Sequence, residues 1–165
     1  MICVGNIAVG GTGKTPHTEY LIKLLQNEGI NVATLSRGYK RKSKGYILAT
    51  AESSVQKIGD EPYQIKSKFP DIRVAVDENR CHGIEQLLTL KNPAVDAVLL
   101  DDAFQHRHVK AGMNILLTDY HRLLCDDALL PAGRLREPAC GKNRAQIVIV
   151  TCLLYTSDAA DEARS

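Results

Sequence analysis

The chain has 165 residues, of which 44% are hydrophobic and 24% are charged, and its formal net charge at pH 7 is +2. This composition is typical of one soluble globular domain that is long enough to bury a core. The 21 basic residues are balanced by 19 acidic ones, so charge gives no argument for a nucleic-acid partner. No apolar run approaches the roughly 18–20 residues of a membrane helix, and no signal-peptide pattern is present, so we expect a cytosolic protein.

Short apolar runs recur along the chain, at residues 2–4, 31–35, 72–76, 95–100, 113–117 and 147–150. Most are typical of buried parallel strands, because they are continuously apolar and β-branched where a half-exposed strand would alternate. Helical patterns with one apolar face lie between some of them, at residues 17–27 and 80–90. The alternation of strand and helix predicts an α/β fold with a doubly wound, mostly parallel sheet.

The first predicted strand is followed by the sequence GNIAVGGTGKTP and then by a helix. Glycines at this place let the backbone fold around an anion, and the positive end of the helix adds to the attraction. The strict P-loop pattern would need Gly where the chain has Ala8, but its functional core is intact. Lys14 is expected to reach the β- and γ-phosphates, and the Thr15 hydroxyl to bind Mg²⁺. The candidate nucleotide-binding residues are Gly10, Gly11, Thr12, Gly13, Lys14 and Thr15.

A second element of phosphate chemistry is the sequence VLLDDAFQH at residues 98–106. An apolar strand that ends in acids is the Walker B arrangement, which brings a carboxylate to the P-loop edge of the sheet to hold Mg²⁺. Asp101 and Asp102 are both candidate metal ligands. Two acids that cap a turn are the alternative, and the P-loop favours the metal site.

Three further segments permit two interpretations each. The adjacent acids Asp60 and Glu61 begin a predicted helix, where they either complement its dipole or include a carboxylate that accepts a substrate proton. Arg134 and Arg136 lie in the loop LPAGRLREP and either bind phosphate or face solvent. The basic run at residues 37–45 is either a solvated loop or a surface for an anionic membrane or a phosphorylated substrate.

These motifs occur together in the order VGNIAVGGTGKTP, LSRGY, IGDEPYQI, VAVDENR, LLDDAFQH and LLPAGRLREP. In this order they resemble the tetraacyldisaccharide 4′-kinase family of lipid A biosynthesis, and most closely its Bacteroidetes-like members. The resemblance covers residues 2 to about 151. It implies a P-loop fold that uses ATP and Mg²⁺ to phosphorylate the 4′-hydroxyl of tetraacyldisaccharide 1-phosphate, giving lipid IVA, at the cytoplasmic face of the inner membrane of Gram-negative bacteria.

The resemblance also implies roles for single residues. It makes Asp60 the general base, and it places His106 near the metal and the phosphates. It assigns Arg136 and Glu137 to the transferring phosphate, and Arg80 to the positioning of substrate or phosphate. Asp101 and Asp102 match the Walker B acids of the family, and Ala8 falls where family members commonly have Thr.

The chain departs from the family pattern at both ends. Family members carry an apolar membrane-anchoring helix before the first strand and a second lobe after the last one, and this sequence has neither. We therefore expect residues 1–151 to be the N-terminal, P-loop lobe of a two-lobe kinase, truncated at both ends. Residues 152–165 match nothing in the family and are expected to be a disordered or artefactual tail. The alternative function is a fragment or stand-alone nucleotide-binding module without lipid kinase activity.

Overall fold

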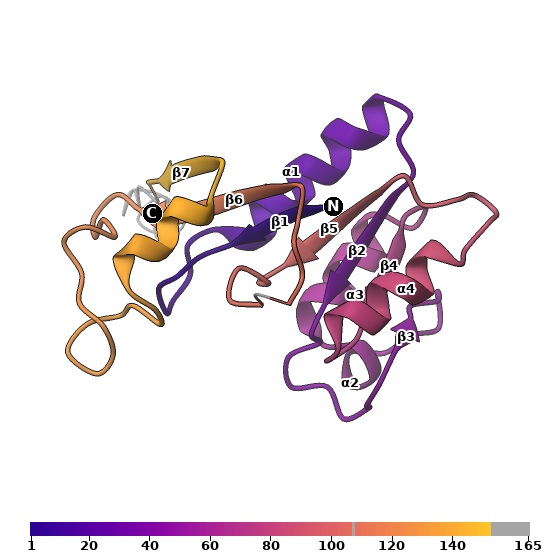
Figure 1. Ribbon diagram of the computed structural model, residues 1–165. Helices are drawn as coiled ribbons and strands as arrows, with labels where there is room; N and C mark the ends of the chain where they lie inside the picture. Colours follow the sequence, from indigo (N-terminus) through magenta and orange to yellow (C-terminus); the bar gives the residue numbers. More distant parts are fainter. Residues whose placement is uncertain (107, 153–165) are drawn as a thin grey trace, which may run out of the picture.

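The computed structural model describes residues 1–106 and 108–152. In this part of the chain, seven strands form one sheet in the order β3-β4-β2-β5-β1-β6-β7 (Figure 1). Every neighbouring pair is parallel except β3 and β4. The strands are β1 (Ile2–Gly5), β2 (Val32–Ser36), β3 (Ile47–Leu48), β4 (Arg73–Val76), β5 (Ala97–Asp101), β6 (Met113–Asp119) and β7 (Ile147–Thr151). The predicted doubly wound, mostly parallel α/β sheet is confirmed, and only the two-residue antiparallel strand β3 was not predicted.

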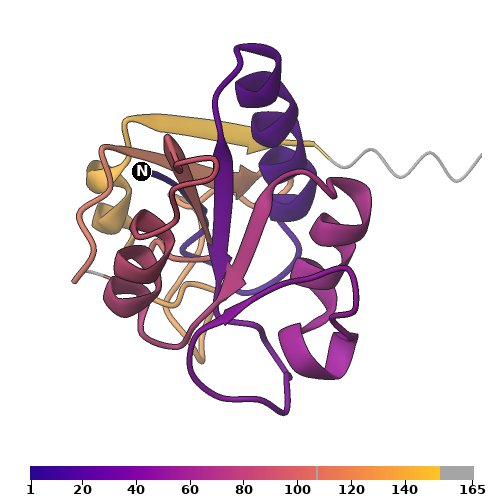
Figure 2. The same cartoon turned by 90° about the vertical axis from the view of Figure 1, so that its right-hand side faces the viewer.

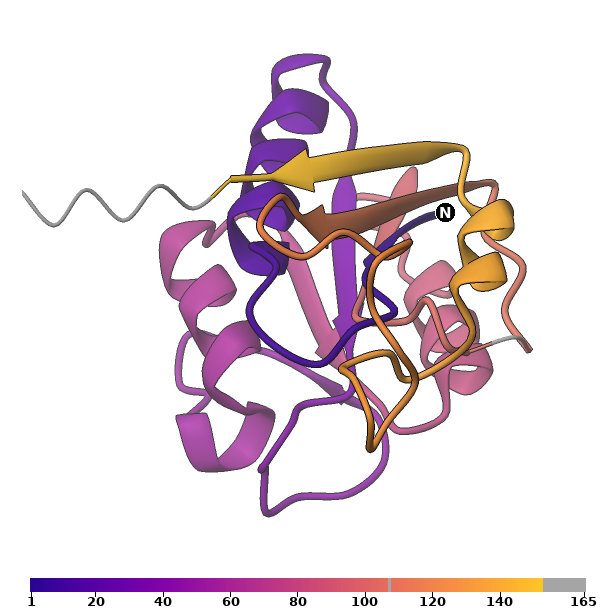
Figure 3. The same cartoon turned by 90° about the vertical axis from the view of Figure 1, so that its left-hand side faces the viewer.

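Helices cover both faces of the sheet (Figures 2 and 3). The first face carries α1 (Lys14–Asn27), α2 (Val55–Ile58) and α3 (Asp60–Lys68), and the second carries α4 (Arg80–Leu88) and the 3₁₀ helix η1 (Ala139–Arg144). Successive residues of a strand point to opposite faces, so each strand contributes to two cores. Leu99 of β5 packs in the core under α1 and α3, whereas its neighbour Leu100 packs in the core under α4.

Strand β1 lies between β5 and β6, which places the first loop of the chain at the centre of the sheet. From β1 the chain winds to β2 and β4 on one side, returns to β5, and then continues to β6 and β7 on the other side. Ligands of doubly wound sheets bind outside the carboxyl ends of the strands where the winding direction reverses. The fold therefore predicts a ligand site at the carboxyl ends of β1 and β5.

Strand β7 is parallel to β6 but is not buried, unlike the central strands. Val148 and Val150 are each 50% exposed, because β7 is the edge strand of the sheet. Beside it, an apolar groove of about 560 Å³ runs between β7 and α1 and is lined by Pro16, His17, Tyr20, Leu21, Ile115, Ile147 and Ile149. Within the described residues, none of the helices has the length and hydropathy that crossing a bilayer requires.

The turn after β5 packs directly on the end of β1. A Cβ at Gly5 would lie 2.8 Å from Cβ and 3.2 Å from the backbone nitrogen of Phe104, and Phe104 is itself buried. Only glycine therefore lets the two carboxyl ends approach this closely.

We predict that Gly5→Ala lowers the free energy of unfolding by about 1–3 kcal/mol, the usual cost of overpacking a buried site. Gly112→Ala is the matched control, because its Cβ would be no closer than 3.6 Å to its nearest neighbour, the oxygen of Met1. Urea unfolding of both variants measures the difference. Equal stabilities for the two variants would contradict the close approach at Gly5.

Candidate active site

The loop after β1 has the backbone shape of an anion-binding P-loop. Gly10 and Gly13 adopt positive φ angles of 121° and 76°, which side-chain-bearing residues rarely adopt. A Cβ at Gly10 or Gly11 would meet no atom within 4 Å, so the space beside these two glycines is open. Helix α1 begins at Lys14, three residues before the predicted start, and the positive end of its dipole adds positive potential at the loop.

The segment around Leu135 pairs with the start of the P-loop. Ala8 forms an antiparallel bridge with Leu135, and the nitrogen of Val9 donates to the oxygen of Arg134 at 2.8 Å. The nitrogen of Arg136 donates to the oxygen of Ile7 at 2.7 Å. Among the described non-glycine residues, positive φ angles occur only at Lys40 and Asp102, so position 8 does not need glycine. This pairing explains how the loop tolerates Ala8.

The two acids at the end of β5 lie in different environments. Asp101 is buried, and its Oδ1 has no hydrogen-bond partner. Its pKa is raised to about 7, mainly by burial and also by the charges of Glu61 and Asp102, whereas Lys14 and Arg80 oppose the rise. Asp102 is half-exposed, and its Oδ1 lies 3.8 Å from Nζ of Lys14.

This arrangement fits a magnesium ion bound together with a nucleotide. The unpartnered carboxylate oxygen of Asp101 is the kind of ligand that Mg²⁺ prefers, and Thr15 is the second residue of α1, next to Lys14, whose charge acts on Asp101. The described residues contain no group of three or more His, Cys, Asp or Glu side chains placed to hold a metal. Mg²⁺ in P-loop proteins takes one or two protein ligands and completes its shell with phosphate oxygens and water.

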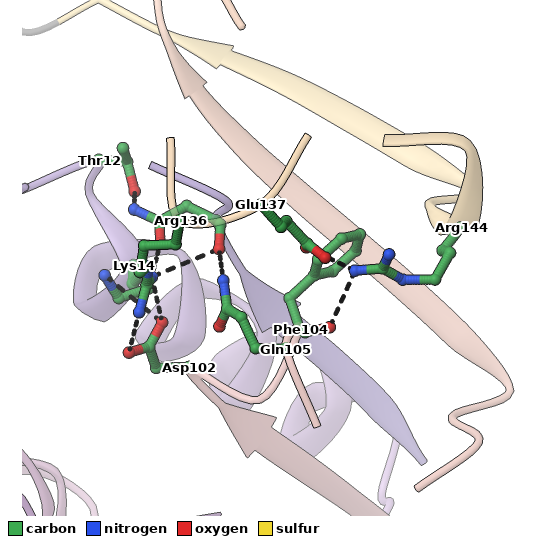
Figure 4. Close-up of polar contacts among 9 residues, drawn as sticks. Thr12, Lys14, Asp102, Phe104, Gln105, Arg136, Glu137 and Arg144 are labelled. Atoms are coloured by element: carbon green, nitrogen blue, oxygen red, sulfur yellow. Dashed lines mark hydrogen bonds and ion pairs between the residues drawn. The ribbon is translucent and has the colours of Figure 1, made fainter. Parts of the chain in front are cut away.

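Arg136 and Glu137 are adjacent in sequence but point to different places (Figure 4). Nη2 of Arg136 lies 3.1 Å from Oδ1 of Asp102, so this guanidinium faces the P-loop and the acids. Oε1 of Glu137 instead accepts a 2.6 Å hydrogen bond from Nη2 of Arg144, whose guanidinium lies over the Phe104 ring. The structure therefore brings Arg136 to Asp102 but does not bring Glu137 there.

Asp60 and Glu61 occupy the first turn of α3, beyond Gly59 at φ 93°. Asp60 is exposed to solvent. Glu61 is close enough to Asp101 for its charge to raise the pKa of that carboxyl group. From the sequence we assigned a chemical role only to Asp60. Glu61 could have been found as well, because it is the adjacent acid of the same motif.

Arg80 and His106 approach the acids from the α4 side of the sheet. Arg80 is buried, donates from Nη1 to the oxygen of Asp77, and has an unpartnered Nε. Burial lowers the pKa of Arg80, while the charge of Asp101 counteracts the shift. His106 is half-buried in the turn after β5, and its pKa is lowered by burial and by the charges of Arg80 and Arg37.

Asn6 and Gln105 belong to this network, although neither was singled out from the sequence. Asn6 is fully buried and donates from Nδ2 to Oγ1 of Thr12 at 2.8 Å. Nε2 of Gln105 donates to the oxygen of Asn6 at 2.5 Å. Both could have been found from the sequence, because each is a polar residue in the first turn after a predicted buried strand.

We predict that Asp101→Asn stabilises the metal-free chain in a pH-dependent way. The ordinary pKa of an aspartate carboxyl group is 3.8, whereas the pKa of Asp101 in the folded chain is about 7. Between these values the folded state binds more protons than the unfolded state, so the contribution of Asp101 to stability falls as the pH rises from about 4 to 7. An uncharged asparagine at position 101 does not titrate, so the variant does not lose stability in this way as the pH rises. The variant should match the wild type near pH 4 and melt about 3 °C or more higher at pH 8.

Thermal unfolding by circular dichroism between pH 4 and 8 measures this effect. Asp71→Asn, at an exposed position before β4, is the control and should follow the wild type at every pH. A difference between Asp101→Asn and wild type that is constant with pH would contradict the raised pKa.

Comparisons with known proteins agree on one family. A model of the tetraacyldisaccharide-1-P 4′-kinase family matches residues 1–165. A tetraacyldisaccharide 4′-kinase from Bacteroides fragilis is 80% identical over 151 residues, which cover 92% of this chain and 40% of that protein. A second, from Bacteroides thetaiotaomicron, is 72% identical with the same coverage of both chains.

A solved structure is also similar. It is the crystal structure of an "apo" form of LpxK from Aquifex aeolicus in complex with ATP, with a TM-score of 0.80 and 42% sequence identity, over 91% of this chain and 47% of that chain. This chain thus spans about 40% of the length of the two Bacteroides relatives. The family resemblance inferred from the sequence motifs is confirmed, and the chain belongs to the tetraacyldisaccharide-1-P 4′-kinase family.

Proposed function

We propose that the longer protein to which this chain corresponds transfers the γ-phosphate of ATP to the 4′-hydroxyl of tetraacyldisaccharide 1-phosphate, giving lipid IVA. The observation that carries the proposal is the convergence of Lys14, Asp102 and Arg136 at the open side of the P-loop, next to the buried Asp101. Phosphoryl transfer needs cations around the transferring group and a carboxylate to hold Mg²⁺, and these residues supply both. Family membership supports the identity of the acceptor.

In this proposal the P-loop backbone, the N-terminus of α1 and Lys14 hold the triphosphate. Mg²⁺, held by Thr15 and the acids of β5, would neutralise charge on the β- and γ-phosphates. Arg136 stabilises the negative charge that develops on the transferring group. Arg80 supplies further positive potential from the α4 side, and His106, whose lowered pKa favours the neutral imidazole, lies near the metal and the phosphates. Glu137 contributes indirectly by fixing Arg144 against the turn after β5.

The acceptor side of the reaction is assigned to Asp60. Its carboxylate takes the proton of the 4′-hydroxyl as the sugar oxygen forms a bond to the γ-phosphorus. The bond from that phosphorus to the bridging oxygen breaks, and ADP leaves with the electron pair. Asp60 is exposed at the beginning of α3, where a bulky acceptor has access.

We further propose that residues 1–151 form the P-loop lobe of a two-lobe kinase. The relatives are more than twice as long as the matched region, and the exposed apolar groove between α1 and β7 is a surface that the rest of such a protein would cover. The lipid acceptor implies work at the cytoplasmic face of the inner membrane, and no nucleic-acid partner is proposed. Of the predicted tail at residues 152–165, all but Cys152 lies outside the described residues.

We predict that the chain binds Mg·ATP and that Lys14→Ala weakens this binding by about tenfold or more, because a charged contact to phosphate is lost. Isothermal titration calorimetry measures the affinities. Lys23→Ala is the matched control, since Lys23 is exposed on the same helix and should leave the affinity unchanged. Equal affinities for Lys14→Ala and wild type would remove Lys14 from the phosphate site.

A second prediction separates phosphate binding from proton transfer. In the full-length protein, Asp60→Asn should lower kcat by more than about tenfold, because the amide cannot accept the hydroxyl proton. In the 165-residue chain the same change should leave the affinity for Mg·ATP within about twofold of wild type. Asp71→Asn serves as the control. Wild-type turnover by Asp60→Asn would exclude Asp60 as the base.

A further inference from the structure

We propose that Asn6 is a positioning residue that couples the P-loop to Arg136 and aligns this arginine on the terminal phosphate of a bound nucleotide. The inference rests on the proposed function in one respect, which is that nucleotide phosphates occupy the P-loop. Nothing in the sequence motifs assigns a role to the Asn6 side chain. The hydrogen bonds of this side chain to Thr12 and Arg136 point to the role.

The Asn6 amide is buried and uses its donor and its acceptor on two different elements. It is 0% exposed and directly follows β1. Nδ2 donates to Oγ1 of Thr12 in the P-loop at 2.8 Å, and Oδ1 accepts a hydrogen bond from Nη2 of Arg136. A buried amide is stable only when both ends are satisfied, so the orientation of Asn6 fixes Thr12 and Arg136 relative to each other.

The backbone of Asn6 adds a third element to the same junction. Its oxygen accepts a 2.5 Å hydrogen bond from Nε2 of Gln105 in the turn after the acids of β5. The same oxygen lies 3.4 Å from Nη2 of Arg136. The P-loop, the turn after β5 and the segment of Arg136 therefore meet at one residue.

The chemistry of an amide suits this position better than that of a carboxylate. On its other side Arg136 contacts Asp102, with Nη2 3.1 Å from Oδ1 and Nη1 3.5 Å from Oδ2. Asp102 also lies 3.8 Å from Lys14, so its charge is shared between two cations. Asn6 holds the guanidinium through a neutral oxygen, which orients Arg136 without cancelling the positive charge that a phosphate needs.

A residue that merely stabilises the fold and a residue that positions Arg136 differ in one measurable quantity. Loss of a structural amide lowers the affinity for ATP and ADP alike. Loss of the alignment of Arg136 lowers the affinity for ATP more than that for ADP, because only ATP carries the γ-phosphate. The ratio of the two affinities is therefore the readout, with Mg²⁺ present throughout.

The experiment is a double-mutant cycle on the 165-residue chain with Asn6→Ala, Arg136→Ala and the double variant, measured by calorimetry with Mg·ATP and Mg·ADP. We expect each single substitution to lower the ATP-to-ADP affinity ratio by about tenfold, and the double variant to lower it no further. Asn114→Ala is the matched control, since the Nδ2 of Asn114 on β6 donates to Gln146, away from the P-loop. It should leave the ratio unchanged.

Two isosteric variants keep the test decisive if Asn6→Ala does not fold. Asn6→Asp places a negative charge on Arg136, and Thr12→Val removes the acceptor that orients the amide, so each should also lower the ratio. Additive losses in the cycle, or equal losses for ATP and ADP in these variants, would overturn the positioning role and leave the proposed function intact. Failure of the wild-type chain to bind either nucleotide would overturn both.

Discussion

The burial of one carboxylate, that of Asp101, governs the electrostatics of this edge of the sheet. A buried charge without a partner is costly, and here the cost appears as a pKa of about 7. Lys14 and Arg80 reduce the cost, whereas Glu61 and Asp102 increase it. The site is therefore poised to gain free energy when a cation arrives. A divalent ion bound with nucleotide phosphates compensates both sets of charges, because the ion neutralises the acids and the phosphates neutralise the surrounding cations.

The placement of that carboxylate follows from the parallel pairing of β1 with β5. The register pairs Val4 with Asp101, so the P-loop and the acids leave the sheet at the same level. Gly5 permits the close approach of Phe104, which in turn holds the turn that carries Gln105. Steric fit at a glycine and the electrostatics of the acids are thus two consequences of one pairing.

The sequence was sufficient for the parts of the site that are local. The P-loop and the acids of β5 each form one short segment at the end of an apolar strand, so pattern and chemistry coincide. Contacts between segments that are distant in the sequence could not be predicted from it. The hydrogen bond between Asn6 and Arg136 joins residues 130 positions apart, and the bridge between Ala8 and Leu135 is set by the tertiary fold.

The same distinction explains the remaining differences from expectation. The family resemblance assigned Arg136 and Glu137 to the same phosphate, but their side chains leave the chain in different directions, one to Asp102 and the other to Arg144. The apolar run of β7 gave the correct strand and direction, yet periodicity alone does not tell a central strand from an edge strand. Strand β3 has only two residues, too few for any pattern to emerge.

The phosphate side and the acceptor side of the site differ in how far the described residues complete them. On the phosphate side Lys14 and Arg136 each contact Asp102, and Asn6 accepts a hydrogen bond from the arginine. Such preorganisation is what makes electrostatic stabilisation effective, because little reorganisation is needed during transfer. On the acceptor side Asp60 is exposed at the start of α3. A base that must meet a large lipid can be left open in this way, whereas a group that must meet a small, highly charged phosphate has to be held in place.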